Sequence, residues 1–303
     1  MHIVISGGTG LIGRNLSEYF RQKNLSVTVL TRFPRYSNDG VRYVRWLVAD
    51  AQPEQELLHV DVWINLAGTS INAGRWDKNH QKQIYQSRMK TTDEVLRIME
   101  ALPKKPGVLI NASAIGIYPT RRDAIYTERS QVVSCDFLGK TVTDWEKKAL
   151  QAQNLGIRTV LTRFGVVLDR KSGALPLMVL PYRLFVGGTI GKGDQWVSWI
   201  HIADVVRAIE FVIQNPDISG PVNLTAPNPV RMRDFGKTVA NVLKRPHWLP
   251  VPAFFLRLLL GKKSQLVLEG QHVFPEVLLE NGFHFQYPEL QGALEDLLRS
   301  EEK

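Results

Sequence analysis

The sequence predicts an α/β fold: a doubly wound parallel sheet followed by a smaller C-terminal α/β domain on the substrate side. Strand-like and helix-like segments alternate through the first half, a glycine-rich turn joins the first strand to the first helix, and the alternation loosens after about residue 165. We therefore expect a first domain over residues 1–165 and a second over residues 166–303, with some chain crossing between them.

The expected strands of the first domain are short apolar runs, several rich in β-branched residues, as in strands that are buried on both faces. They cover residues 2–6, 27–31, 41–46, 61–67, 108–113 and 158–164. Helical periodicity predicts helices at residues 12–22, 78–102 and 141–155 between them. In the second half the pattern favours helices at residues 203–214, 232–243 and 290–298 and a strand at 221–225.

The basic balance of the chain, a formal net charge of +9, raises the question of an anionic partner. Its lysines and arginines are scattered in pairs and form no long run or arm, which is typical of a solvated surface. We therefore expect no nucleic-acid partner. An anionic cofactor or small-molecule substrate is compatible with this charge.

Cysteine and hydropathy content limit the class of protein further. The only cysteine, Cys135, excludes an intrachain disulfide and a cysteine-cluster metal site, and it fits a reducing compartment. The chain enters its first strand without a cleavable leader, and the apolar residues 254–260 are interrupted by Arg257 and too few to span a bilayer. We expect a cytoplasmic protein with no metal and no membrane partner.

The most informative motif is a glycine-rich turn. Gly7, Gly10 and Gly13 have the spacing of a dinucleotide-binding turn that follows a strand and opens a helix. The first glycine permits the tight turn, the second lets the backbone approach a pyrophosphate, and the third lets the helix pack closely on the strand. This predicts a Rossmann-type domain. Cofactor contacts are also expected from three neighbours in the turn and the helix start: Thr9, Leu11 and Ile12.

The end of the second strand indicates which cofactor binds. An enzyme that prefers NAD usually carries an acidic residue about 20 residues past the glycines, where it bonds the ribose 2′-hydroxyl. No Asp or Glu lies between Glu18 and Asp39, and the strand end at Thr31 is followed by Arg32 and Arg35. A guanidinium suits a 2′-phosphate through charge-assisted hydrogen bonds. The sequence therefore predicts that NADP(H) is preferred over NAD(H).

Further motifs carry a family resemblance. Residues 65–68 (Asn-Leu-Ala-Gly), 111–118 (Asn-Ala-Ser-Ala-Ile-Gly-Ile-Tyr) and 199–204 (Trp-Ile-His-Ile-Ala-Asp), with the glycine turn, resemble the extended short-chain dehydrogenase/reductases of the NAD(P)-dependent epimerase/dehydratase group. The last third resembles an atypical, epimerase-like subfamily of largely unassigned activity, with its own C-terminal domain, that includes family 39U of the short-chain nomenclature. The matching pieces are Gly236, Arg245-Pro246, residues 250–252, 258–261 and 282–285, and Tyr287-Pro288.

The resemblance implies positions for the site. The loop after the fourth strand would line the cofactor near its ribose through Leu66, Ala67 and Gly68. Ser113 falls at the end of the fifth strand, where the superfamily places a catalytic Ser or Thr that bonds a substrate oxygen. The register to Tyr118 could instead put Ala114 at that position.

The chain also departs from the family pattern. The superfamily's acid/base is a tyrosine with a lysine one helical turn later, but residues 135–142, where it would fall, hold no tyrosine. The literal Tyr19 and Lys23 pair belongs to the first helix, away from any chemistry. Weak substitutes as a proton-transferring group are Tyr118, Lys140, Asp136 and Cys135. Cations that could hold an anionic substrate are Arg88, Arg163 and His201.

Two functions are compatible with these residues. The first is an NADP(H)-binding epimerase- or reductase-like protein, an oxidoreductase or isomerase, that acts on an unidentified small molecule. The alternative is a catalytically silent NADP(H)-binding sensor or scaffold, which the missing tyrosine favours. The substrate, the reaction type and the oligomeric state stay open.

Overall fold

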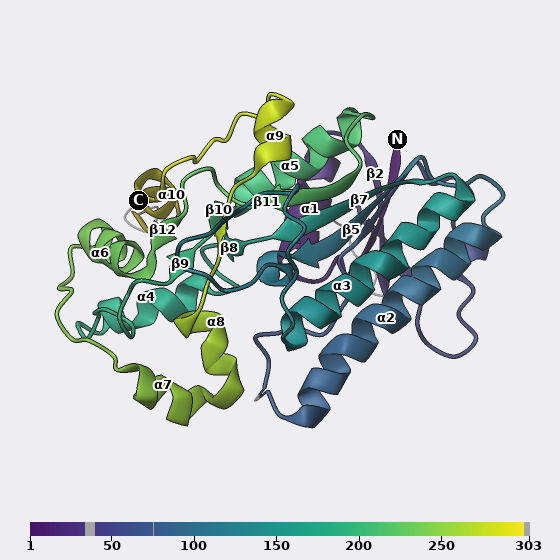
Figure 1. Cartoon of the computed structure of the whole chain (residues 1–303). Helices are drawn as coiled ribbons and strands as arrows, with labels where there is room; N and C mark the ends of the chain where they lie inside the picture. Colours follow the sequence, from purple (N-terminus) through teal and green to yellow (C-terminus); the bar gives the residue numbers. More distant parts are fainter. Residues whose placement is uncertain (34–39, 75, 300–303) are drawn as a thin grey trace.

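The computed structural model describes residues 1–33, 40–74 and 76–299. A seven-stranded sheet forms its centre, in the order β11-β7-β5-β4-β1-β2-β3, and every neighbouring pair is parallel (Figure 1). This is a Rossmann-type order, which reverses direction between β1 and β4, so the predicted doubly wound α/β fold is confirmed. The strands are β1 (His2–Ser6), β2 (Ser26–Thr31), β3 (Arg42–Arg45), β4 (Val62–Asn65), β5 (Val108–Ala114), β7 (Arg158–Phe164) and β11 (Gly220–Leu224).

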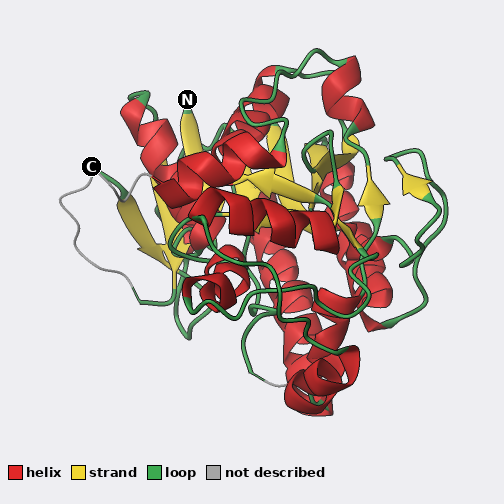
Figure 2. Cartoon of the chain, turned by 90° about the vertical axis from the view of Figure 1, so that its left-hand side faces the viewer, coloured by secondary structure: helices red, strands yellow, loops and turns green. Residues whose placement is uncertain are grey.

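Helices cover both faces of the sheet, as a parallel sheet requires (Figure 2). On one face α1 (Leu11–Gln22) packs beside α5 (Ile202–Gln214), and on the other α2 (Lys78–Ala101) lies beside α3 (Phe137–Ala149). Tyr19 and Lys23 on α1 both bond the carboxylate of Glu210 on α5. The Tyr19 and Lys23 pair therefore links α1 to α5 on this face of the sheet and has a structural role.

The third helix begins earlier than its periodicity predicts. Asp136 caps it, because its side chain accepts a hydrogen bond of 2.8 Å from the N–H of Gly139, so α3 starts at Phe137. Beyond Ala149 the chain tightens into a 3₁₀ turn that ends at Gly156, whose φ of 75° is left-handed. The expected helix at residues 141–155 is therefore an α-helix followed by a separate turn.

A second apolar core lies among α4 (Leu175–Arg183), α6 (Met232–Leu243) and α10 (Leu290–Arg299). Two short sheets adjoin this core: β8 (Val166–Leu168) with β10 (Trp199–His201), and β9 (Trp196–Val197) with β12 (Val230–Arg231). The other helices and strands are β6 (Ile125–Tyr126), β13 (His272–Val273), α7 (Ala253–Leu260), α8 (Gln265–Leu268) and α9 (Glu276–Glu280). The 3₁₀ turns are Pro53–Gln55, Ile115–Ile117, Leu150–Leu155 and Gly261–Ser264.

Segments from both halves of the chain build the central layer. β11 and α5 both follow residue 165. Nevertheless β11 forms the edge strand beside β7, and α5 packs against α1. β13 in turn pairs with β6, which precedes that residue. The late segments therefore fold back on the sheet. Within the described residues, no helix combines the length and apolar character needed to cross a membrane.

One buried carboxylate joins α5 to the C-terminal segment. Asp204, in the first turn of α5, has no exposed surface. It accepts hydrogen bonds from the backbone N–H groups of Gln286 (2.7 Å) and Tyr287 (2.8 Å) and from the guanidinium of Arg207 (2.8 Å). Because a buried donor without an acceptor is costly, this carboxylate fixes the segment that leads into α10.

We expect Asp204→Ala to lower the free energy of unfolding by about 3 kcal/mol, because two backbone donors and one guanidinium lose their acceptor. The exposed Asp217, near the end of the same helix, provides the matched control Asp217→Ala. Urea denaturation of both variants measures the difference. Equal losses of less than about 0.5 kcal/mol in the two variants would contradict this role of Asp204.

Candidate cofactor site

The turn between β1 and α1 brings three backbone segments into close approach. Gly7 has a left-handed φ of 81°, and a Cβ there would lie 2.7 Å from the carbonyl carbon of Leu66. A Cβ on Gly13 would lie 2.5 Å from the Cα of Gly8. The tight turn and the close packing of the helix therefore both need glycine. These are the structural reasons that the sequence predicted for the first and third glycines.

Gly10 has a different reason to be glycine. A Cβ there would meet a single protein atom within 4 Å, the oxygen of Gly7 at 3.3 Å. Gly10 is the N-cap of α1, no side chain caps this helix, and its first turn holds no acidic residue. The N–H groups at the start of α1 are therefore open to an anion, with the positive end of the helix dipole behind them. A phosphate group in the space in front of Gly10 stays a prediction.

A cavity of about 400 Å³ adjoins this turn at the carboxyl ends of β1, β2 and β4. It brings together six of the predicted cofactor residues: Gly7, Thr9, Thr31, Arg32, Ala67 and Gly68. Leu11, Ile12 and Leu66 are half-buried, pack against the core and are not among the described residues that line the cavity. Arg35 lies outside the described residues. The other lining residues are Leu30, Phe33, Trp46, Leu47, Thr69, Ser87, Lys90 and Thr91.

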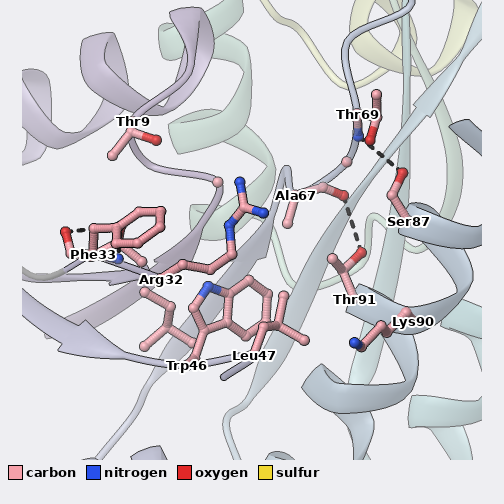
Figure 3. A pocket seen from close by; sticks show the side chains of 14 residues that line it. Thr9, Arg32, Phe33, Trp46, Leu47, Ala67, Thr69, Ser87, Lys90 and Thr91 are labelled. Atoms are coloured by element: carbon pink, nitrogen blue, oxygen red, sulfur yellow. Dashed lines mark hydrogen bonds between the residues drawn. The ribbon is translucent and has the colours of Figure 1, made fainter. Parts of the chain in front are cut away.

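The described lining of this cavity carries positive charge and no carboxylate. Arg32 reaches across it between Thr9 and Ala67, and Lys90 lies on the opposite wall, on α2 (Figure 3). Both cations are exposed. Lys90 was not predicted from the sequence. Its spacing of three from Ser87 places the two residues on one helix face, but only the fold shows that this face turns toward the cavity.

α2 also holds the loop that follows β4. The hydroxyl of Thr91 donates to the carbonyl of Ala67 at 3.1 Å, and the hydroxyl of Ser87 accepts from the N–H of Thr69 at 3.0 Å (Figure 3). These side chains fix the residues 67–69 at the rim of the cavity. A cofactor would therefore meet a loop whose position is set in advance.

Ser113 is not among the described residues that line this cavity. It lies on β5 beside Arg163 on β7, is 3% exposed, and its hydroxyl donates to Glu146 Oε1 on α3 at 2.5 Å. Glu146 also forms a buried ion pair with Arg163, with two hydrogen bonds of 2.8 Å. This geometry gives no support to the catalytic role expected of Ser113. It does not decide whether Ser113 or Ala114 occupies the position of the family's catalytic hydroxyl.

Tyr118 belongs to the same buried group. It is 1% exposed, accepts a hydrogen bond from Arg163 at 2.8 Å and donates one to Asn223 at 2.9 Å. Its ring stacks on Tyr126, with 5.2 Å between the centroids. Burial raises the pKa of Tyr118 despite the neighbouring guanidinium. The expected role of Tyr118 as a proton-transferring group gains no support either, because its hydroxyl is enclosed and bonded within the protein.

The start of α3 offers no replacement for the missing tyrosine. Asp136 caps the helix, and the exposed Cys135 and Lys140 are not among the described residues that line the cavity. Phe137 packs edge-on against Trp76, with 6.1 Å between the ring centroids. None of these described side chains combines an acidic proton with a position on the cavity.

Of the three cations considered for an anionic substrate, Arg88 alone has no carboxylate partner among the described residues. Arg163 is paired with Glu146, and the nearly buried His201 has its Nε2 3.2 Å from Asp296. Arg88 donates to the carbonyls of Thr69 and Ile84 and lies 5.0 Å above the Trp145 ring. Burial lowers its pKa to about 10. This guanidinium therefore lies behind the rim of the cavity, and no carboxylate among the described residues neutralises its charge.

Two family matches cover most of the chain. Residues 3–224 match the NAD dependent epimerase/dehydratase family, and residues 251–297 match a domain of unknown function, DUF1731. The chain is 48% identical over 299 residues to the epimerase family protein YfhF of Bacillus subtilis, with 98% of each chain covered. It is 41% identical over 298 residues to the epimerase family protein SERP0438 of Staphylococcus epidermidis, covering 98% of this chain and 99% of that one.

Solved structures show the same relationship. The human epimerase family protein SDR39U1, crystallised with NADPH, matches with a TM-score of 0.87 and 30% identity over 99% of both chains. A nucleoside-diphosphate sugar epimerase from Corynebacterium glutamicum matches with a TM-score of 0.79 and 29% identity, over 98% of this chain and 58% of that one. The resemblance drawn from the motifs is confirmed: this chain belongs to the NAD dependent epimerase/dehydratase family and carries a DUF1731 domain at its C-terminal end.

Proposed function

We propose that this chain binds NADP(H) in preference to NAD(H) and acts on a small molecule as an epimerase- or reductase-class protein. The observation that carries the proposal is the cavity beside the glycine turn, whose described lining offers Arg32 and Lys90 and no carboxylate. A carboxylate would select the free 2′-hydroxyl of NAD, whereas two cations favour a 2′-phosphate. The NADPH in the structure of human SDR39U1 is consistent with this choice.

Each part of the cavity has a task in this proposal. The N–H groups at the start of α1, in front of Gly10, would hold the pyrophosphate. Arg32 and Lys90 would hold the 2′-phosphate, and Trp46 and Leu47 supply an apolar wall for a purine ring. The bound cofactor would supply hydride transfer.

Proton transfer is the weak part of such a site. Ser113 and Tyr118 are buried and bonded to Glu146 and Arg163, so neither hydroxyl is available to a substrate. Turnover would therefore proceed with little acid–base assistance, a contribution that is typically ~10²–10⁴-fold. The same burial favours a second candidate, a catalytically silent NADP(H)-binding sensor or scaffold.

We expect NADPH to bind at least about tenfold more tightly than NADH, which is about 1.4 kcal/mol. Arg32→Ala should weaken NADPH about tenfold and leave NADH unchanged, since only the 2′-phosphate loses a charge-assisted bond. Lys90→Ala should act in the same direction. Lys82→Ala, an exposed position on the same helix, is the matched control. Calorimetry that gives equal affinities for the two cofactors would refute the preference.

Gly10→Val should abolish cofactor binding without unfolding the chain. The valine side chain would occupy the space in front of α1, and its Cβ would make one tight contact, 3.3 Å from the oxygen of Gly7, which a small shift of the turn relieves. Gly292→Val, at an exposed helical glycine with no atom within 4 Å of its Cβ, controls for the substitution itself. Circular dichroism should report folded protein for both. Tight NADPH binding by Gly10→Val would show that the turn has only a structural role.

The choice between the two candidate functions needs a turnover assay. We expect slow NADPH oxidation with activated carbonyl compounds or sugar nucleotides, since no tyrosine is among the described residues that line the cavity and the hydroxyls of Ser113 and Tyr118 are buried and bonded within the protein. NADPH absorbance measured at saturating cofactor tests this directly. If NADPH binds tightly and no compound in a broad screen is reduced or epimerised, the silent sensor or scaffold is the correct function.

A further inference from the structure

α7 presents a wide apolar face that no described part of the chain covers. Its sequence is almost entirely apolar, yet none of its residues is buried. The half-buried Ala253, Leu256 and Leu260 face the protein. The outward side chains are Phe254, Phe255, Leu258 and Leu259, exposed by 70%, 51%, 80% and 58%. At 3.6 residues per turn these four span roughly 140°, as wide as the stripe that a helix normally buries in a core.

The loop before α7 extends this surface. Trp248 is 68% exposed and Leu249 47%, and both backbone N–H groups bond the carbonyl of Gly187. The indole N–H of Trp248 donates to the carbonyl of Phe185 at 2.9 Å, and Phe185 is itself 52% exposed. These three side chains and the four outward side chains of α7 are called the α7 patch. The helix α7 itself lies at one edge of the molecule, away from the central sheet (Figure 1).

The chain segment that contains α7 is basic. Between Phe235 and Leu268 the sequence holds six lysines and arginines and no Asp or Glu. Five of them, Lys237, Lys244, Arg245, Arg257 and Lys262, are exposed. The sixth, Lys263, is half-buried and donates to the carbonyl of Asn72. An exposed apolar surface of this size marks an interaction site. The exposed lysines and arginines of this segment, called the basic rim, favour an anionic partner.

We propose that the α7 patch docks this protein on the surface of an anionic lipid membrane. Trp, Phe and Leu on the outer face of a helix with Lys and Arg at its border are the composition of helices that lie in the interface plane. Each basic residue near an anionic surface adds to the attraction. We expected no membrane partner because no segment can span a bilayer, but α7 needs only to lie on one. A two-fold contact between copies would bring two basic rims together.

Co-sedimentation with lipid vesicles tests the proposal on the full chain. We expect the protein to sediment with vesicles that contain phosphatidylglycerol and to stay in solution with pure phosphatidylcholine. Raising the salt concentration should release it, because screening weakens the attraction of the basic rim. Phe254→Ser/Leu258→Ser should reduce the bound fraction at least about tenfold through lost apolar burial. Arg257→Gln/Lys262→Gln should reduce it about tenfold.

Matched controls come from exposed residues elsewhere on the molecule. Leu58→Ser/Val132→Ser removes the same kind of apolar surface, and Lys82→Gln/Lys104→Gln removes the same charge. Both should sediment like the unaltered chain, and circular dichroism checks that every variant is folded. No sedimentation of the folded, unaltered chain with anionic vesicles would overturn the proposal. So would a dimer that Phe254→Ser/Leu258→Ser converts to monomer, or capture of an acidic protein in place of vesicles.

Discussion

The close approach of β1 and β4 is the constraint on which the cofactor site depends. At their carboxyl ends Gly7 lies so near the backbone of Leu66 that no side chain fits between them. The strand order reverses at this point, so α1 and α2 leave toward opposite faces and a crevice opens above the strand ends. Gly7 and Thr9 of the glycine turn and Ala67 of the loop after β4 then line the same cavity.

A second group of residues satisfies its charges internally. Ser113, Tyr118, Glu146 and Arg163 come from β5, the turn after it, α3 and β7, and their side-chain hydrogen bonds end within the group, on Asn223 and on the carbonyl of Thr127. A buried ion pair contributes little net stability but is costly to break. By the family resemblance these strand ends are where a catalytic hydroxyl is expected. Here the hydroxyls of Ser113 and Tyr118 are hydrogen-bonded inside the protein. The residues that favour cofactor binding in this chain are therefore different from those that would have to transfer a proton.

Local patterns made the fold predictable from the sequence. β1, β7 and α6 have the bounds that the pattern predicts, because apolar runs and helical periodicity are properties of neighbouring residues. The glycine turn was predictable for the same reason. Ser113 was not, because its burial depends on Glu146 and Arg163, which reach it from other elements.

Contacts between residues that the fold brings together from distant parts of the sequence could not be predicted from the sequence. Lys90 lies on the long helix α2, whose periodicity does not tell which face turns toward the loop after β4. The apolar residues of α7 have the composition of a buried helix, yet the packing leaves half of that helix uncovered. Composition alone cannot distinguish a core helix from one whose outer face awaits a partner.

The most direct test of the account is a crystal structure of this protein with NADPH. We predict that the pyrophosphate lies against the N–H groups of Leu11 and Ile12, in front of Gly10, and that the 2′-phosphate lies between Arg32 and Lys90. Ser113 and Tyr118 should keep their bonds to Glu146 and Arg163. A 2′-phosphate in solvent away from both cations, or NADPH bound at another place on the chain, would contradict the account.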